Sequence, residues 1–374
     1  MFLAPQLLLL AAPLVPLPAQ PADVPWPTHQ WLTGPIPSSV DAGALAKLLD
    51  VVDRVDDLLG ETRAVVVVHR GRLVVERYRQ GFGPGMRLIS WSMAKSITHA
   101  LVGVAAREGK LDPDRPMGNP RWAANDARSA ISWRQWLQMV DGQEYREIIA
   151  RSPAENDAAK MLFGEGRLDA AKYAAHLPLI HRPGEHWNYN SAGFILLSDG
   201  LARAIAPKAA TPDTRRSVVR GFMQRELFDR IGMGSAQPEF DASGTFLGSA
   251  LVYATAQDFA RFGLLYLRDG VWEGSRILPE GWVDFARTPP PGSDGNIYGA
   301  GFWVAPADGQ PRPPYGSAIL APRDTFQAQG FEGQLTVIVP SKDLVLVRLG
   351  HMPQSGWRAL SRWIANVVAL FPDG

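Results

Sequence analysis

Residues 90–96 read Ser-Trp-Ser-Met-Ala-Lys-Ser and contain the only Ser-x-x-Lys pattern of the chain, formed by Ser92 and Lys95. They open a stretch, residues 90–108, whose apolar side chains recur with the period of a helix that ends at Gly109. Residues three apart lie on one face of a helix, so the serine hydroxyl and the lysine amine can touch. The stretch therefore predicts a serine and a lysine that meet at the start of a helix.

The side chains around this pair are apolar and would remove water from the lysine amine. They are Ile89, Trp91, Met93, Ile97 and Leu101. Loss of water and the positive end of the helix dipole both disfavour the ammonium form. An uncharged amine could take the serine proton, which an arginine could not do. A surface lysine beside a capping serine is the alternative that the pattern alone leaves open.

The composition of the chain narrows the classes of protein to which it can belong. Its 374 residues are 46% hydrophobic and 20% charged, which is ordinary for a soluble globular protein with a large core. The 38 Lys and Arg residues balance 37 Asp and Glu residues, so the charge gives no reason to expect nucleic acid as a partner. Cysteine is absent, which excludes disulfides, thiolate nucleophiles and cysteine-based metal sites.

Other catalytic and cofactor motifs are missing or incomplete. No Gly-x-Ser-x-Gly elbow occurs, and residues 103–110 have one residue too many between their glycines for a phosphate loop. His176, His181 and His186 are five residues apart, which does not place two of them on one helix face. We therefore expect neither a metal site nor a bound cofactor.

The amino terminus has the composition of an export signal. Residues 7–12 are apolar, residues 17–19 resemble the end of a signal peptide, and four prolines make residues 1–18 a poor membrane-spanning helix. No lysine or arginine precedes the apolar run, so a disordered tail or a mispredicted start is the alternative. We expect residues 1–22 to be a signal peptide, the protein to be periplasmic or secreted, and no stable membrane span.

Apolar patterns along the rest of the chain predict a mixed fold. Strand patterns cover residues 64–69, 73–78, 301–304, 325–329, 334–339 and 344–349, and helical patterns cover 40–59, 133–140, 169–176, 192–205, 218–231, 256–267 and 357–371. Two amino-terminal strands alone would be marginal, so strands from both ends of the chain must share one sheet. We expect an α/β (α+β) sandwich formed by residues 23–120 and 268–374, in which helices flank an antiparallel sheet. Residues 121–267 would be an inserted all-helical lobe.

Two further segments offer groups that suit acyl transfer. Tyr189 follows a Pro-Gly turn and enters a helical pattern, and a phenol beside an amine can relay a proton to a leaving group. Residues 330–334, Gly-Phe-Glu-Gly-Gln, run into a strand pattern, where glycine lets a substrate lie against the backbone. An amide there could form half of an oxyanion hole, with the amide of Ser92 as the other half. Taken alone, each segment is explained as well by a buried tyrosine or a tight turn.

In this order and at these separations, the segments resemble the class C β-lactamase-like superfamily of serine hydrolases. Its members include penicillin-binding D,D-peptidases, family VIII carboxylesterases and nylon-oligomer hydrolases. The resemblance covers about residues 40–372 and rests on residues 90–96, 109–112, 136–142, 183–185, 189–191, 196–197, 254–263 and 330–334. Residues 90–96 and the Gly-x-x-Gly-Gln segment resemble most closely the nylon-oligomer hydrolase and esterase branch.

The resemblance implies a mechanism and a place for it. Ser92 would be the acylated nucleophile, Lys95 its base, and Tyr189 the proton shuttle to the leaving group. The site would lie between the sandwich and the helical lobe, and the reaction would need no metal or cofactor.

The resemblance also implies binding residues, with two departures from the family pattern. Gln334, by its amide, would partner Ser92 in the oxyanion hole, with a slip of one to three residues left open, and Gly333 and Tyr145 would border the substrate. The family's tyrosine motif ends in Asn where this chain has Ser191, and its strand motif has Lys or His where this chain has Phe331. Because that cation would bind a substrate carboxylate, a neutral ester or amide is favoured over a penicillin.

We therefore expect a carboxylesterase or amidase whose partner is a small-molecule ester or amide. A cell-wall D,D-peptidase or β-lactamase is the first alternative, and a non-catalytic binding protein on the same scaffold is the second. The natural substrate would depend on loops such as 141–168 and 288–320, and the sequence carries no signal for an oligomeric state.

Overall fold

A computed structural model describes residues 13–148, 150, 152, 154–291, 297–306 and 320–374. Its helices are α1 (Ala42–Leu49), α2 (Ala94–Arg107), α3 (Trp133–Leu137), α4 (Asp157–Phe163), α5 (Ala170–His176), α6 (Ser191–Ile205), α7 (Pro212–Met223), α8 (Ala256–Leu267), α9 (Trp282–Ala286) and α10 (Trp357–Leu370). Its strands are β1 (Glu61–His69), β2 (Arg72–Tyr78), β3 (Leu88–Ile89), β4 (Gln237–Pro238), β5 (Val252–Ala254), β6 (Val271–Trp272), β7 (Ser275–Arg276), β8 (Trp303–Val304), β9 (Phe326–Gly330), β10 (Gln334–Val339) and β11 (Leu344–His351).

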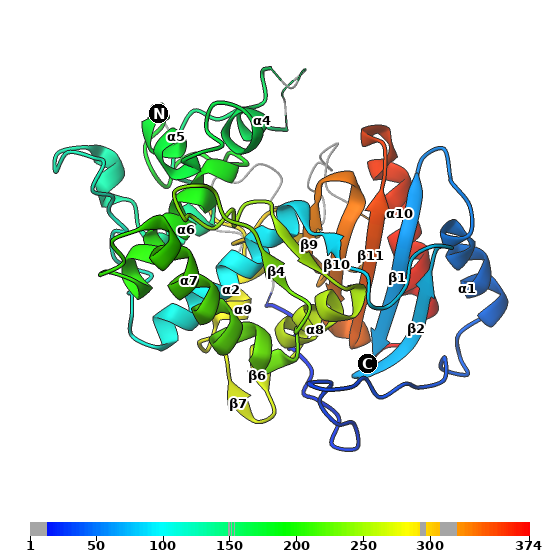
Figure 1. The fold of residues 1–374 in the computed structure, drawn as a ribbon. Coiled ribbons are helices and arrows are strands. Elements are labelled where there is room, and N and C mark those ends of the chain that lie inside the picture. Colours follow the sequence, from blue (N-terminus) through cyan, green and yellow to red (C-terminus); the bar gives the residue numbers. More distant parts are fainter. Residues whose placement is uncertain (1–12, 149, 151, 153, 292–296, 307–319) are drawn as a thin grey trace, which may run out of the picture.

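An antiparallel sheet of six strands, in the order β2-β1-β11-β10-β9-β8, organises one half of the molecule (Figure 1). β1 pairs with β11 along its whole length, from Glu61 opposite His351 to His69 opposite Leu344. Strands from the two ends of the chain therefore share one sheet, and the expected α/β sandwich is confirmed.

Both faces of this sheet are covered by helices, as the run of valines in β1 requires. Alternate residues of a strand point to opposite faces, and Val65, Val66, Val67 and Val68 are all fully buried. Val65 and Val67 belong to a core that includes residues of α1 and α10. Val66 and Val68 belong to the larger core, which includes α2 and α8 and continues into the remaining helices.

Helices α3 to α7 gather at the end of the molecule away from α1 and α10 (Figure 1). α6 is central to this group, since it packs against α2, α3, α5 and α7. α8 falls inside the expected helical lobe of residues 121–267, yet it packs against β1, β10 and β11 of the sheet. The two-lobe division stays a prediction, and these contacts place α8 with the sandwich.

Several elements differ from the sequence patterns for local reasons. The helix expected over residues 40–59 ends at Leu49, and the carboxylate of Asp56 then accepts hydrogen bonds from the amides of Leu58 and Leu59. Such side-chain bonds compete with helical ones. The helix expected from residue 218 begins at Pro212, because Thr211 caps it and proline suits the first turn.

The amino-terminal segment lies against the folded body. The carbonyl of Val15 accepts a hydrogen bond from Arg287 at 2.7 Å, and the carbonyl of Pro18 accepts one from Arg268 at 3.3 Å. Residues 1–12 lie outside the described part of the chain, so the expected signal peptide stays a prediction. In the described part, none of the helices is long and apolar enough to span a membrane.

Candidate active site

Ser92 lies in a single 3-10 turn, Trp91–Met93, that leads directly into α2. The preceding Ser90 fixes this turn to β5 and the loop before it. Its amide donates to the carbonyl of Val252 at 2.8 Å, and its hydroxyl donates to the carbonyl of Ala250 at 3.2 Å. Trp91 has a φ of 43°, a left-handed conformation that is strained for a bulky residue. The bonds of Ser90 therefore hold a strained turn that carries the serine.

The amine of Lys95 meets three uncharged acceptors. It donates to Ser92 Oγ at 2.9 Å, to Ser191 Oγ at 2.8 Å and to the carbonyl oxygen of Ser249 at 2.8 Å. Lys95 is only 1% exposed, although its type is almost never fully buried without a partner. The structure thus brings Ser92 and Lys95 together one helical turn apart, with the amine shielded from water.

Burial controls the charge of this amine. Loss of water lowers the pKa of Lys95 from 10.5 to about 8, and the carboxylate of Glu147 opposes this shift only in part. About half of the amine is therefore uncharged at a mildly alkaline pH near this value, and a smaller fraction at neutral pH. A lysine in this state can accept the proton of an adjacent hydroxyl.

Tyr189 completes the group of three side chains. The Lys95 amine lies 4.8 Å from the centre of its ring, and the ring stacks on Trp303 with 5.3 Å between centroids. Burial raises the pKa of Tyr189 well above its usual value, and a hydrogen bond with Ser92 lowers it only in part. The phenol of Tyr189 therefore keeps its proton at the pH at which Lys95 loses one. Tyr189 can then act as an acid while Lys95 acts as a base.

The tyrosine is positioned by the residue that follows it. Asn190 caps α6 by accepting a hydrogen bond from the amide of Gly193 at 3.1 Å. Its amide group donates to the buried carboxylate of Asp141 at 3.0 Å. The helix cap thereby anchors the segment that carries Tyr189 against the loop after α3.

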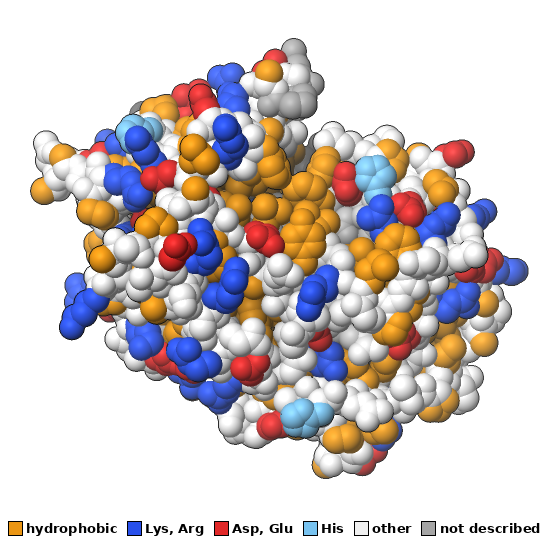
Figure 2. Space-filling model, viewed as in Figure 1, with side chains coloured by type: hydrophobic (Ala, Val, Ile, Leu, Met, Phe, Trp, Pro, Cys, Tyr) orange, Lys and Arg blue, Asp and Glu red, His pale blue; other side chains and the backbone are white. Residues whose placement is uncertain are grey.

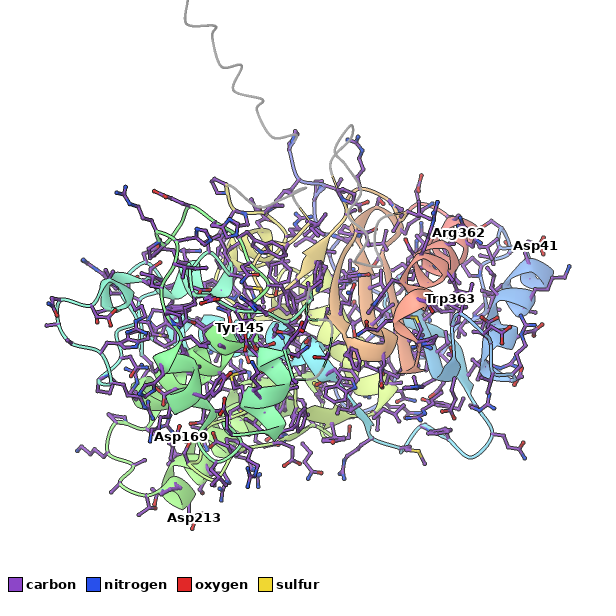
Figure 3. The ribbon with its side chains drawn as sticks, turned by 90° about the horizontal axis from the view of Figure 1, so that it is seen from above. Asp41, Tyr145, Asp169, Asp213, Arg362 and Trp363 are labelled. Atoms are coloured by element: carbon purple, nitrogen blue, oxygen red, sulfur yellow. The ribbon has the colours of Figure 1, made fainter. Side chains whose placement is uncertain are left out.

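Tyr145 lies behind the site rather than at its surface. It is 3% exposed, its side chain reaches Ser191, and its carbonyl accepts a hydrogen bond from Asn188 at 2.9 Å. In Figure 3 it lies near the centre of the molecule, between the end that carries Asp169 and Asp213 and the opposite end. The structure thus places Tyr145 where it supports Ser191, and its expected contact with substrate stays a prediction.

Of the two glycines in residues 330–334, Gly330 is the one that meets the serine turn, and the expected role of Gly333 in binding substrate stays a prediction. A Cβ added to Gly330 would lie 2.2 Å from the carbonyl oxygen of Ser90 and 3.1 Å from Trp91 Cβ. A Cβ added to Gly333 would instead meet Arg348 at 2.7 Å. β9 therefore approaches the serine turn with its last residue, three positions before Gly333.

Gln334 has a structural contact that the sequence did not indicate. Its side-chain amide donates to the carbonyl of Gly350, and its side-chain oxygen accepts from the amide of Gly350 at 3.0 Å. The side chain of Gln334 thus joins the β9–β10 turn to β11 and does not face the serine. The expected role of the Gln334 backbone amide in the oxyanion hole, with a slip of one to three residues left open, stays a prediction.

Arg348, in β11, also binds the turn between β9 and β10. This buried guanidinium donates to the carbonyls of Glu332 and Gly333, each at 3.0 Å, and to the carbonyl of Leu59 at 2.7 Å. Burial lowers its pKa to about 9. A charge that satisfies several backbone carbonyls at once fixes the turn between β9 and β10 relative to β11.

Two acceptors of the Lys95 amine, Ser191 and the carbonyl of Ser249, were not predicted from the sequence as functional groups. Ser191 was visible only as a departure from the family pattern, although its place two residues after Tyr189 is a usable signal. The Ser249 acceptor is a backbone carbonyl 154 residues away from Lys95 along the chain, and its residue type gives no signal. If Gly330 is taken as the reference glycine, the strand position at which the family has Lys or His is Ala328, which is uncharged like Phe331.

Comparisons with known proteins agree with this architecture. The 6-aminohexanoate-dimer hydrolase of Paenarthrobacter ureafaciens is 26% identical over 323 residues, which cover 83% of this chain and 78% of that protein. The penicillin binding protein from Bacillus halodurans has a TM-score of 0.61 at 17% identity, covering 87% of this chain and 100% of its own. EstCE1, described as a hydrolase with promiscuous acyltransferase activity, has a TM-score of 0.63 at 15% identity, covering 88% and 98%. A profile of the Beta-lactamase family matches residues 53–370, and the chain therefore belongs to the β-lactamase family.

Proposed function

We propose that this protein is a serine hydrolase that cleaves a small, neutral ester or amide through a covalent acyl-enzyme on Ser92. The observation that carries the proposal is the buried amine of Lys95, 2.9 Å from Ser92 Oγ and with a pKa lowered to about 8. Such an amine is the base that a serine hydroxyl needs, because the free hydroxyl is a weak nucleophile. The relatives named as hydrolases support the same reaction class.

Acylation begins with the serine. Ser92 Oγ attacks the carbonyl carbon of the substrate while its proton passes to the amine of Lys95. The tetrahedral intermediate then expels the alcohol or amine. That leaving group takes a proton from the phenol of Tyr189, and the ammonium of Lys95, whose nitrogen lies 4.8 Å from the centre of the Tyr189 ring, returns a proton to the phenolate oxygen. The proton thus ends on the leaving group, and Lys95 is uncharged again.

Deacylation reverses the order with water as the nucleophile. The uncharged Lys95 accepts a proton from a water molecule that attacks the ester carbonyl of acyl-Ser92. The bond between the acyl carbon and Ser92 Oγ then breaks, and the proton returns to the serine. The products are a carboxylic acid and the free enzyme.

Two backbone amides would stabilise the negative oxygen of both intermediates. One is the amide of Ser92, in the 3-10 turn before α2, and the other is the amide of Phe331. The support for Phe331 is the close approach of Gly330 to the Ser90 carbonyl and the ring contact of Phe331 with Trp91 at 5.7 Å. Donors of this kind contribute on the order of a hundredfold or more to kcat.

A substrate without a carboxylate fits this site better than a penicillin. The place of the family's cationic strand residue is taken by Phe331 or, with Gly330 as the reference glycine, by Ala328. Neither side chain can pair with a carboxylate. A cell-wall D,D-peptidase or β-lactamase would need that interaction, and labelling by a fluorescent penicillin would favour this alternative.

The decisive variant is Ser92→Ala, measured on a small ester such as p-nitrophenyl acetate. Turnover should fall to the uncatalysed background, and Lys95→Arg should be almost as inactive because a guanidinium does not act as a base. Ser129→Ala is the matched control, since the half-buried Ser129 belongs to a different segment and its hydroxyl donates to the carbonyl of Ala123 at 3.3 Å. Turnover retained by Ser92→Ala would overturn the proposal, and a panel of esters, linear amides and a chromogenic cephalosporin would define the substrate class.

A further inference from the structure

Three aromatic side chains meet immediately beside the serine and form what we call the aromatic patch: Trp91, Phe163 and Phe331. The ring of Trp91 contacts Phe163 edge-on at 6.2 Å and Phe331 edge-on at 5.7 Å. Phe163 ends α4 in the helical part of the molecule, whereas Phe331 follows β9 of the sheet. The patch therefore spans both halves of the molecule, with Trp91 joined directly to Ser92.

The patch is open to solvent although its side chains are apolar. Phe163 is 56% exposed and Phe331 is 45% exposed. Figure 2 shows hydrophobic side chains gathered in the upper middle of this face, between the helical part and the strands. Exposed apolar side chains that cluster, rather than scatter, mark surfaces that bind an apolar ligand.

A second aromatic group lies around Tyr189, and it is buried. The Tyr189 ring stacks on Trp303 and meets Tyr298 edge-on at 5.9 Å, and all three residues are at most 7% exposed. The leaving group must approach Tyr189, because the phenol supplies its proton. The acyl portion must then extend from Ser92 in another direction, and the exposed rings beside Ser92 offer an apolar surface for it.

We propose that the aromatic patch binds an apolar acyl chain, so that the enzyme prefers esters or amides of medium-chain or aryl carboxylic acids. This inference rests on the proposed acyl-enzyme at Ser92. The residue directly before the nucleophile is Trp91, which keeps its large ring although its left-handed φ of 43° is strained for such a side chain. Strain of this kind is typical of a functional position. No charged side chain belongs to the patch, so it selects for apolar area and not for a charged group.

The test is a series of p-nitrophenyl esters from acetate to octanoate, which changes the acyl chain and keeps the leaving group. In the unaltered enzyme, kcat/KM should rise about twofold for each added CH₂. This factor corresponds to half of the transfer free energy of a fully buried CH₂, because a chain on a half-exposed patch would be about half buried. Phe163→Ala should flatten this dependence, and Phe163→Leu should restore most of it. Leu58→Ala is the control, since Leu58 is 49% exposed and lies outside the patch.

The outcomes separate this inference from the proposed function. Turnover that depends on Ser92 but not on acyl length would overturn the patch assignment alone, as would an unchanged dependence in Phe163→Ala. Alkyl acetates of increasing alcohol length test the other side of the ester. If Phe163→Ala removes a dependence on alcohol length instead, the patch binds the leaving group and the acyl assignment is wrong. Turnover that survives in Ser92→Ala would overturn the proposed function itself.

Discussion

The amine of Lys95 donates to two hydroxyls and one carbonyl, none of which carries a charge. A buried ammonium without a carboxylate in contact is costly, and the cost is reduced when the amine gives up its proton. The burial that makes the charged form of Lys95 costly is therefore also what makes its uncharged form available as a base. The proposed function therefore depends on the protonation state of the Lys95 amine.

The first prediction concerns pH. Because the uncharged amine is the reactive form, kcat/KM for a neutral ester should rise with pH and reach half of its limit near the pKa of about 8 that burial gives Lys95. Below this pKa, each unit of pH should lower kcat/KM about tenfold. Rates measured from about pH 6 to about pH 10 test it. A midpoint near 6.5, the usual pKa of histidine, would contradict the assignment of Lys95 as the base.

The second prediction concerns Ser191. Ser191→Ala removes one of three acceptors from the Lys95 amine, so the ammonium loses support and the rising limb of the pH profile should move to lower pH. The amine also loses part of its orientation, and kcat/KM should fall by about tenfold. Ser198→Ala is the control on the same helix, because among the described residues the Ser198 hydroxyl bonds only to the carbonyl of Phe194. An unchanged midpoint in Ser191→Ala would show that Ser191 does not set the state of the amine.

The sequence was informative about individual residues where the chemistry lies within one helical turn. Ser92 and Lys95 are three positions apart, so helix geometry alone predicts that they meet. Gly330 could not be chosen over Gly333, because both are glycines in one short segment and only the approach of β9 to Ser90 separates them. The Ser249 acceptor is a main-chain group, which no side-chain pattern identifies.

Among the secondary-structure elements, the contact between β9 and the 3-10 turn of Ser92 decides the geometry of the site. The end of β9 lies so close to Ser90 that only glycine fits there. β3 and β5 hold the same turn from the other side, through the bonds of Ser90 to residues 250 and 252. The serine turn is therefore clamped between the large sheet and the small one.

The third prediction follows from that clamp. In Gly330→Ala the added Cβ would lie 2.2 Å from the Ser90 carbonyl oxygen, so either the strand or the serine turn must move. A shift of about 1 Å in an active site can cost about a hundredfold in rate, and kcat should fall on that order. Gly83→Ala is the control, because a Cβ there meets nothing within 4 Å. Gly330→Ala with full activity and unchanged thermal unfolding would contradict the close approach.

Two elements with a regular apolar pattern were predicted to the residue, whereas the short strands β3, β4 and β5 were not predicted at all. The pattern over residues 334–339 coincides with β10, and that over 256–267 coincides with α8. Strands β3, β4 and β5 contain two or three residues each, which is too few for any period to appear. They form the small sheet that fixes Ser90, so part of the site's support was invisible in the sequence.

At the scale of the whole molecule, strands from both ends of the chain close one sheet, and the candidate active site lies where that sheet meets the helices. The need of two early strands for partners predicted this closure. The sequence pattern did not identify which helices cover the sheet, because an amphipathic helix has the same apolar pattern whether it packs on the sheet or on other helices. α8 shows this, since its sequence lies within the expected helical lobe but the helix packs on β1, β10 and β11.

The fourth prediction concerns the amino-terminal segment. Deleting residues 1–22 removes the carbonyl of Pro18 and the side chain of Gln20 from Arg268, and the carbonyl of Val15 from Arg287. Arg268 is buried and would keep its bond to Asp343 at 2.6 Å. We expect the shortened chain to be less stable by at least about 2 kcal/mol, the size of one hydrogen bond to a charged group. Thermal unfolding of the two chains at one pH measures this, and identical curves would show that the segment adds nothing to the fold.

The central claim is that Ser92 is a nucleophile activated by Lys95, and active-site labelling tests it most directly. The enzyme is treated with a fluorophosphonate, digested, and mapped by mass spectrometry. The account predicts one adduct, on the peptide that contains Ser92, formed faster as the pH rises through about 8 and absent from both Ser92→Ala and Lys95→Arg. An adduct on another serine, or equal labelling of Lys95→Arg, would contradict it.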